Sequence, residues 1–255
     1  MYVFPENGGK PEKMPIPASE LEKANALHNA LVEAAAENEE GLMEKYFEKG
    51  NLDETELAKG LTIALANQQI FPVFCASGLK DMGSGRVMGF IDDIAPSPAD
   101  RPAKKLENGV ELKCDASDKT TIFIYKTLSE PQVGQVSYFK VYSGELNVGD
   151  ELINAENGET ERITQLFVTE GKERAAVNKL VAGDLGATVR LKYAHSNQTL
   201  NAKGVDRKIE KMHFPQSRIR KAVTTSNPKD IEKLIKSLHQ IEEEDLTFRV
   251  EQNPE

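Results

Sequence analysis

The feature that most constrains the fold is a change of hydrophobic period near Thr120. From there to Leu200, apolar and polar residues alternate in short runs, and Gly, Asn and Asp separate the runs. A period of two is typical of half-buried β-strands. We therefore predict a small antiparallel barrel over residues 119–204. The apolar residues of these runs are Ile122, Ile124, Val136, Phe139, Val141, Leu152, Ile153, Ile163, Leu166, Val168, Val189 and Leu191.

The turns of this barrel are explicit in the sequence. Gly144 and Gly149 bracket one predicted strand, Asn157-Gly158 is a hairpin dipeptide, and Gly183-Asp184 repeats the Gly-Asp pattern of residues 149–150. We expect Gly144, Gly149 and Gly183 to lie at turns, some with positive φ, where a Cβ costs about 1 kcal/mol.

The part before the barrel, residues 1–98, has a longer period. Helices are predicted over residues 19–40, 42–47, 53–65 and 82–94. Ser19 is predicted to cap the first helix, and Gly41 to interrupt it. Asp53 and Glu56 have the spacing of a capping box. Residues 70–74 are predicted as a short strand, although Pro72 disfavours a central position in a sheet.

The remaining segments are shorter. Residues 99–118 hold few apolar side chains and are predicted to be a linker or a loose hairpin. Within residues 205–255, the pattern indicates strands at 219–223 and 246–250 around a helix over 228–244, which is half of a split βαβ unit. The predicted fold class is a multi-domain α+β chain: a helical or αβ segment, a β-barrel and a partial ferredoxin-like βαβ unit.

Charge is distributed unevenly along the chain. The net charge is −9 and argues against a simple nucleic-acid binder. Residues 1–98 carry 8 Lys and Arg against 16 Asp and Glu, so the halves are expected to have different partners. No run of apolar residues reaches the length of a transmembrane helix. The two cysteines, Cys75 and Cys114, lack CxxC spacing, which favours a reduced, cytoplasmic protein.

Five stretches in succession resemble elongation factor G, a translational GTPase. They are Leu-Val-Glu-Ala-Ala-Ala-Glu at 31–37 with Leu-Met-Glu-Lys-Tyr at 42–46, Cys-Ala-Ser-Gly-Leu-Lys at 75–80, residues 133–144, Val-Ala-Gly-Asp-Leu-Gly-Ala at 181–187, and Phe-Pro at 214–215. The resemblance implies an internal fragment of that family. Residues 1–98 would be the end of a P-loop GTPase domain with its helical insert, 119–204 the second domain, and 205–255 the first half of the third.

The nucleotide-binding elements of that family are missing from the sequence. There is no GxxxxGK[ST] cradle for phosphates, no DxxG and no NKxD. The resemblance implies that Ser77, Gly78, Leu79 and Lys80 contact guanine only in a full-length protein, together with GTP or GDP and Mg²⁺. Four histidines without metal-ligand spacing suggest no metal site. We expect this chain to have no catalytic residue, no cofactor and no enzyme activity.

Two sets of charged residues are candidate binding surfaces. Glu33, Glu37, Glu40 and Glu44 repeat at helical spacing, and would form one stripe if a single helix continued past Gly41. The resemblance implies that this stripe meets the basic stalk protein of the large ribosomal subunit. The second set is basic and would touch rRNA phosphates; it comprises Arg207, Lys208, Lys211, Arg218, Arg220 and Lys221. For each set a solvated surface without a partner is the alternative.

Several residues depart from the family pattern. Arg190 stands where a barrel strand of the family has glycine, and Asn197-Gln198-Thr199 replaces a Gly-Asp-Thr turn. Ser217 lies where a Pro-x-Pro-like run opens the third domain. These departures put contacts of individual residues in doubt, but not the fold.

The resemblance implies a ribosome-docking part of a factor that promotes translocation of tRNA and mRNA, in the cytoplasm, without membrane or DNA partners. Ribosomal-protection proteins against tetracycline and peptide-chain release factor GTPases share this architecture and stay as alternatives. A free-standing barrel adaptor for a peptide or small ligand is an alternative of another class.

Overall fold

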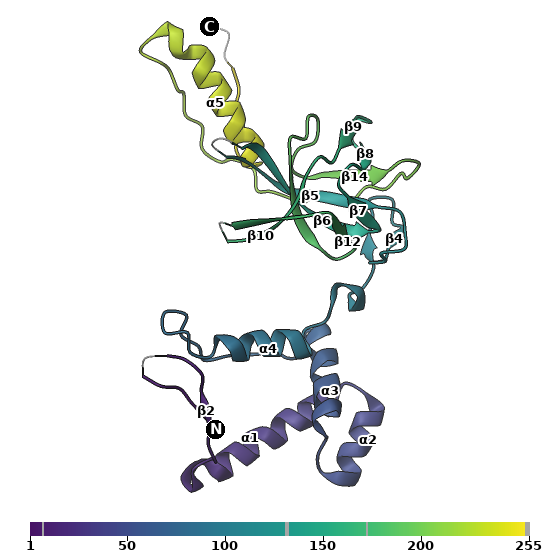
Figure 1. Ribbon diagram of the computed structural model, residues 1–255, viewed down its shortest axis with the longest axis vertical. Helices are drawn as coiled ribbons and strands as arrows, with labels where there is room; N and C mark the ends of the chain where they lie inside the picture. Colours follow the sequence, from purple (N-terminus) through teal and green to yellow (C-terminus); the bar gives the residue numbers. More distant parts are fainter. Residues whose placement is uncertain (7, 131–132, 172, 253–255) are drawn as a thin grey trace. The chain divides into compact units, whose positions relative to one another are not determined.

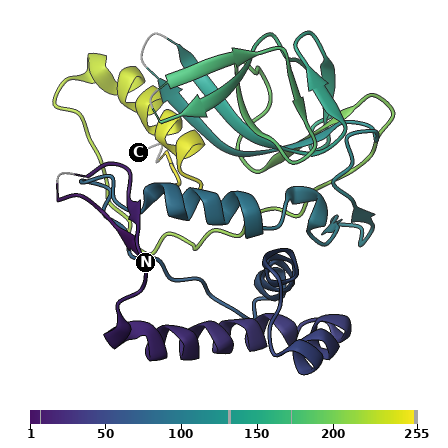
Figure 2. The ribbon, with the colours of Figure 1, turned by 60° about the horizontal axis from the view of Figure 1, so that its bottom comes forward.

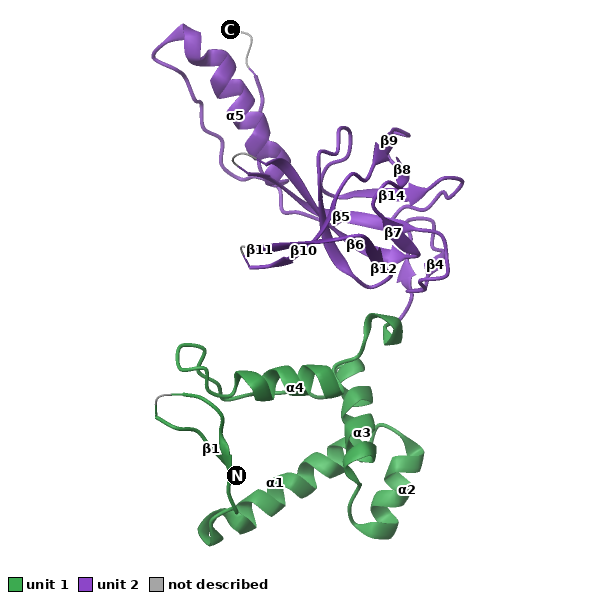
Figure 3. Ribbon diagram, in the orientation of Figure 1, with its two compact units in different colours: residues 1–101 green, residues 102–255 purple. Residues whose placement is uncertain are grey.

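The structure is a computed structural model that describes residues 1–6, 8–130, 133–171 and 173–252. The chain divides into two compact units, Met1–Arg101 and Pro102–Glu255, which Figure 3 colours separately. The boundaries of the four predicted segments stay predictions, since the observed grouping divides the chain only once. The predicted end of the last segment, residues 253–255, lies outside the described residues.

The first unit is mainly helical (Figure 1). A short hairpin of β1 (Tyr2–Val3) and β2 (Glu12–Lys13) precedes the helices. The helices are α1 (Ala18–Ala36), α2 (Glu40–Lys49), α3 (Glu54–Ala66) and α4 (Ser84–Ile94). One apolar cluster joins α1 to α2 through Val32, Ala36 and Leu42, and a second joins α1, α3 and α4. Burial of these side chains orients the helices, because it removes apolar area from water.

Of the predicted signals at helix ends, the capping box is confirmed, whereas those at Ser19 and Gly41 were wrong. Asp53 and Glu56 form the expected capping box: the Asp53 carboxylate accepts from the Glu56 amide, and the Glu56 carboxylate accepts from the Asp53 amide. Ser19 was wrong as a cap, since α1 begins one residue earlier and Pro17 occupies the N-cap position. Gly41 does not interrupt a helix either. It is the second residue of α2, and the break lies at residues 37–39.

The predicted strand at residues 70–74 is not formed. These residues have no regular secondary structure, and Phe71 and Val73 are almost fully exposed. A strand needs a neighbour to accept and donate its backbone hydrogen bonds, and none of the strands in the described ranges pairs with this segment.

The second unit begins with a short hairpin rather than an extended linker. After a 3₁₀ turn, η1 (Pro98–Asp100), the strands β3 (Lys104–Lys105) and β4 (Glu111–Leu112) pair in antiparallel fashion. Leu106 and Leu112 are buried with Phe123 and Ile209 in one apolar cluster. Of the two predictions for residues 99–118, the hairpin therefore describes the structure.

The predicted barrel is a large antiparallel sheet joined by a separate pair of short strands. Its apolar core contains Ile122, Ile124, Phe139, Val141 and Leu200, all fully buried. The strands are β5 (Thr121–Glu130), β6 (Gly134–Ser143), β7 (Glu145–Asn147), β8 (Glu151–Asn154), β9 (Thr160–Arg162), β10 (Leu166–Glu170), β11 (Glu173–Val177), β12 (Lys179–Val181), β13 (Leu185–Val189) and β14 (Gln198–Ala202). The order in the large sheet is β11-β10-β13-β6-β5-β14-β8-β9, and β12 pairs with β7.

The backbone at the turns explains both the glycines and two departures from the family pattern. Gly144, Gly149 and Gly183 have φ of 76°, 100° and 99°, as predicted. Arg190 and Asn197 also have positive φ, 64° and 71°. Asn tolerates this region, and the Asn197 side chain accepts from the Met212 amide and donates to its carbonyl oxygen. Arg190 carries the strain that a glycine would avoid.

The C-terminal segment contains the predicted helix without the predicted strands. The 3₁₀ turn η2 (Pro228–Asp230) leads into α5 (Ile231–Glu244), which lies against the end of β5 in Figures 1 and 2. Residues 219–223 and 246–250 have no strand assignment. They run near each other, since the Ser217 hydroxyl donates to the Thr247 carbonyl oxygen, but no backbone ladder joins them. Two lone extended segments gain too few hydrogen bonds to form a stable sheet.

Candidate functional site

The loop predicted to contact guanine is a tight turn in the first unit. The Ser77 amide donates to the Met82 carbonyl oxygen at 2.8 Å, and the Met82 amide donates back to Ser77 at 3.0 Å. The Asp81 amide donates to the Gly78 carbonyl oxygen at 3.3 Å, while the Leu79 side chain is fully exposed. The Ser77 amide is therefore already hydrogen-bonded within the turn. Only Gly78, Leu79 and Lys80 have groups left that could bind a ligand.

An open hollow lies beside this loop. Lys10, Asp81, Gly83 and Arg86 contribute to its lining. The Arg86 guanidinium also lies 4.2 Å from the centroid of the Tyr2 ring. Two cations next to a carboxylate give a mixed surface, whereas phosphate binding relies on a Gly-rich run of backbone amides. Gly83 and Gly85 at the start of α4 do line the hollow, but the sequence lacks the GxxxxGK[ST] motif, so the hollow is no P-loop phosphate cradle.

The four glutamates of the predicted acidic stripe are all exposed, but they do not share one helix. Glu33 lies in α1 and Glu37 is its C-cap residue, whereas Glu40 and Glu44 lie in α2. The condition for a single stripe, a helix that continues past Gly41, is therefore not met. The break arises because the Glu37 and Glu39 amides close the end of α1 by donating to Glu33 and Ala36. The structure presents two acidic faces, and their predicted partner stays a prediction.

The six basic residues fall into two groups. Arg207, Lys208 and Lys211 belong to a segment held on the barrel by the pairing of Leu106 with Ile209. The other three, on the extended segment beside α5, are all exposed: Arg218, Arg220 and Lys221. Arg220 alone among these three lies near a carboxylate of the described chain, that of Glu251, at 3.8 Å.

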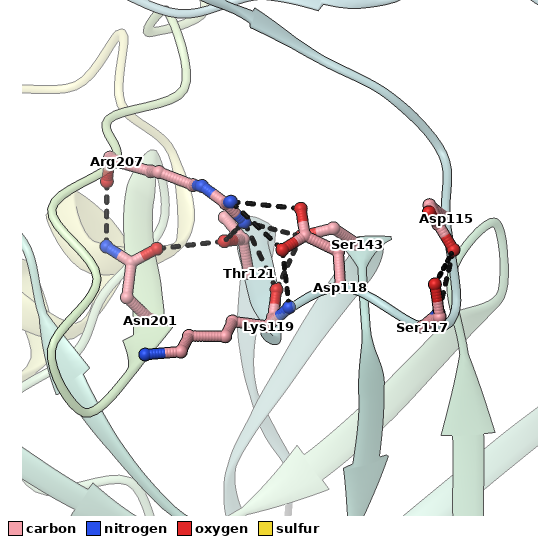
Figure 4. Close-up of polar contacts among 8 residues, drawn as sticks. All are labelled: Asp115, Ser117, Asp118, Lys119, Thr121, Ser143, Asn201 and Arg207. Carbon is pink, nitrogen blue, oxygen red and sulfur yellow. Dashed lines mark hydrogen bonds and ion pairs between the residues drawn. The ribbon is translucent and has the colours of Figure 1, made fainter.

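Arg207 is a structural residue of the barrel and not a free phosphate-binding group (Figure 4). Its guanidinium donates to both carboxylate oxygens of Asp118, at 2.9 and 3.1 Å. It also donates to the Lys119 carbonyl oxygen and to the hydroxyls of Thr121 and Ser143. Its prediction as an rRNA contact is therefore corrected: an Arg with these five acceptors has little capacity left for a phosphate.

The same network sets the charge of Asp118. Partial burial of the carboxyl opposes its ionisation, but hydrogen bonds from Arg207 and the Lys119 amide, with the Arg207 charge, outweigh it and lower the pKa. A folded-state pKa below the unfolded value adds stability above the unfolded pKa, and this stability is lost as pH falls through the folded pKa.

We expect Asp118→Asn to destabilise the second unit by about 1.5 to 3 kcal/mol at pH 7, the usual range for a hydrogen bond to a charged group. The loss should shrink as pH falls below about 4, where the parent carboxylate is protonated as well. Urea unfolding at pH 7 and at pH 3 measures it. Asp115→Asn is a matched control, because that side chain is exposed and bonds only to neighbouring Ser117. A difference between parent and Asp118→Asn that does not change with pH would contradict this account.

Lys208 and Lys211 lie near the carboxyl of Glu156. Burial raises the pKa of this carboxyl, while the Thr199 amide and the charges of Lys211 and Lys208 oppose the rise. Lys211 is exposed and makes no ion pair within 4 Å among the described residues, so its ammonium group is accessible to a partner.

Sequence reasoning missed the residue that organises the barrel loop 190–198. The buried carboxylate of Glu161 on β9 accepts from the amides of Lys192, Tyr193 and Ala194 at 2.5 to 3.0 Å. The loop thereby presents Tyr193 with 46% of its surface exposed. The sequence carried no signal for this role, because Glu161 stands between two other polar residues, Thr160 and Arg162, and its burial is evident only in the structure.

Metal and membrane sites have little support in the described ranges. Outside residues 7, 131–132, 172 and 253–255, no three His, Cys, Asp or Glu side chains are grouped so that they could hold a metal ion. None of the helices within those ranges is both long enough and apolar enough to span a bilayer.

Comparisons with known proteins give matches for the second unit and for the whole fold. Residues 134–201 match the family model of elongation factor Tu domain 2, and residues 214–255 match that of elongation factor G, domain III. A crystal structure of a protein from Thermus thermophilus is similar, with a TM-score of 0.83 at 24% identity over 99% of this chain. The match covers 36% of that protein's chain, and at this identity it shows the fold alone.

Proposed function

We propose that this chain docks on the ribosome during protein synthesis. The chain is elongation factor G-like, because a match to elongation factor Tu domain 2 is followed by a match to elongation factor G domain III. The observation that carries the proposal is the order of these two domains in one chain. In this function the chain is a mechanical part of a translocation factor. It binds the ribosome, and its domains transmit conformational changes.

The proposed role involves binding without catalysis. Hydrolysis of GTP needs a phosphate cradle, a metal-positioning Asp and a group that orients water. The first two of these are not found in the sequence, and the turn at residues 77–82 uses the Ser77 amide internally. We propose that GTP, GDP and Mg²⁺ bind only where the missing motifs are supplied.

The small-subunit rRNA is the proposed partner of the second unit. Lys211, Arg218 and Lys221 are exposed and make no ion pair among the described residues, whereas Arg207 is engaged with Asp118 and Arg220 lies 3.8 Å from Glu251. The domain 2 scaffold supports this role physically. A sheet with a fully buried core and the pinned loop 190–198 presents a surface of fixed shape, which lowers the entropy cost of docking.

The proposed partner of the acidic first unit is the basic stalk protein of the large subunit. Its exposed glutamates on α1 and α2 suit a positively charged surface. The uneven charge of the chain supports two partners, because a single phosphate-rich partner would repel the acidic helices.

Co-sedimentation with purified ribosomes tests the proposal. We expect the parent chain to sediment with ribosomes, and Lys211→Glu with Lys221→Glu to weaken binding about tenfold and to reduce its salt dependence by about two phosphate contacts. Lys113→Glu with Lys126→Glu is a control of equal charge on two other exposed lysines of the second unit. A parent chain that stays in the supernatant at low salt would overturn ribosome docking and favour a free-standing adaptor.

A further inference from the structure

The outward face of α2 carries an exposed aromatic side chain among carboxylates. Phe47 has 78% of its surface exposed, a larger fraction than other exposed apolar side chains of the described helices, such as Leu27 at 63% and Met88 at 64%. Glu40, Glu44 and Glu48 are exposed as well. Positions i, i+4, i+7 and i+8 share one face of an α-helix, so the three carboxylates border the ring.

This face is held rigidly by the opposite side of the helix. Leu42 is buried, and Tyr46 packs against the cluster that joins α1 to α2. Gly50 ends the helix with a φ of 67°, and the Lys45 ammonium pairs with the Glu56 carboxylate at the start of α3. The exposure of Phe47 is therefore a property of a well-packed helix.

The arrangement selects the chemistry of its partner. An aromatic anchor bordered by acidic groups complements an apolar pocket bordered by Lys or Arg. Nucleic acid is disfavoured, because its phosphates would face three carboxylates and the first 98 residues carry twice as many acidic as basic side chains.

We propose that α2 docks by inserting Phe47 into an apolar pocket of a basic protein domain, while Glu40, Glu44 and Glu48 pair with the cations around that pocket. The inference rests on the proposed function, which supplies the ribosomal stalk protein as the basic partner. It adds an apolar anchor to a contact that the sequence predicted to be purely electrostatic. It also places the contact on α2 rather than on a stripe continuing from α1.

Titration of the full chain with the purified stalk protein tests the anchor. Phe47→Ala should raise the Kd about tenfold to a hundredfold, by a factor that changes little between low and high salt, because the lost contact is apolar. Glu40→Lys with Glu44→Lys should weaken binding strongly at low salt and less at high salt. Phe47→Leu should retain most of the affinity, since leucine also fills an apolar pocket.

Phe71→Ala is a matched control, because Phe71 is exposed to 79% but lies on the irregular segment before α4. It should leave the Kd unchanged. Thermal unfolding of all variants should match the parent, as each altered side chain is exposed. Equal Kd for Phe47→Ala and the parent, while the parent still binds the stalk protein and ribosomes, would overturn the anchor and leave ribosome docking intact. Failure of the parent to bind either would remove the proposed function and this inference with it.

Discussion

Replacing Gly144 by alanine is expected to lower the free energy of unfolding of the second unit by about 2 to 5 kcal/mol. Gly144 has a φ of 76°, a region that costs L-residues about 1 to 2 kcal/mol. A Cβ there would also lie 2.5 Å from the Thr120 amide nitrogen, 2.6 Å from its Cα and 2.8 Å from the Asp118 carbonyl oxygen. Overpacking of this kind costs about 1 to 3 kcal/mol, and these atoms are backbone, which cannot rotate away.

Gly149→Ala separates the steric effect from the conformational one. Gly149 has a φ of 100° at another turn of the same sheet, and a Cβ there would meet no atom within 4 Å. We expect a loss of about 1 to 2 kcal/mol for this variant. Urea unfolding of both variants, followed by far-ultraviolet circular dichroism, measures the difference. Equal losses would show that the segment at residues 118–120 moves aside and that the close approach has no energetic consequence.

Glu161→Gln is expected to destabilise the second unit by about 1.5 to 3 kcal/mol, the usual range for hydrogen bonds to a charged group. The parent carboxylate is buried and accepts from three consecutive backbone amides. A Gln of the same shape can offer one oxygen, but its NH₂ group would face a backbone N–H. All three amides donate to one carboxylate oxygen, so the loss is that of the charge that strengthens these hydrogen bonds and of the second Lys192 contact, about 1.5 to 3 kcal/mol in total.

The effect of Glu161→Gln should concentrate in the loop 190–198. Hydrogen exchange is expected to show faster exchange of the amides of residues 192–194, with little change in β5 and β6. Glu159→Gln is the control, because Glu159 lies two residues away with an exposed side chain. Unchanged protection of residues 192–194 in Glu161→Gln would mean that the backbone amides find other acceptors and that the carboxylate does not hold the loop.

Most elements that depend on local patterns were predicted correctly, although the Ser19 cap and the break at Gly41 were not. The alternation from Thr120 onward, the capping box of Asp53 and Glu56, and the positive φ of Gly144 all depend on residues close together in the sequence. The predictions at 70–74, 219–223 and 246–250 failed for the opposite reason. Their β-branched and aromatic residues suit a strand, but a strand forms only with a neighbour that takes its hydrogen bonds.

For this protein, the sequence by itself determined the helical class of the first unit, the β-sheet of the second, the order of these parts and the uneven distribution of charge. Only the tertiary structure decided which charged groups are free. The Arg207 guanidinium donates to the Asp118 carboxylate, and the Glu161 carboxylate accepts from three amides of a loop some 30 residues away. Glu40 and Glu44 lie on a different helix from Glu33. The physical reason is that folding brings a charged group next to its hydrogen-bonding and ion-pair partners. These partners lie far away along the chain, so the sequence near the charged residue does not reveal them.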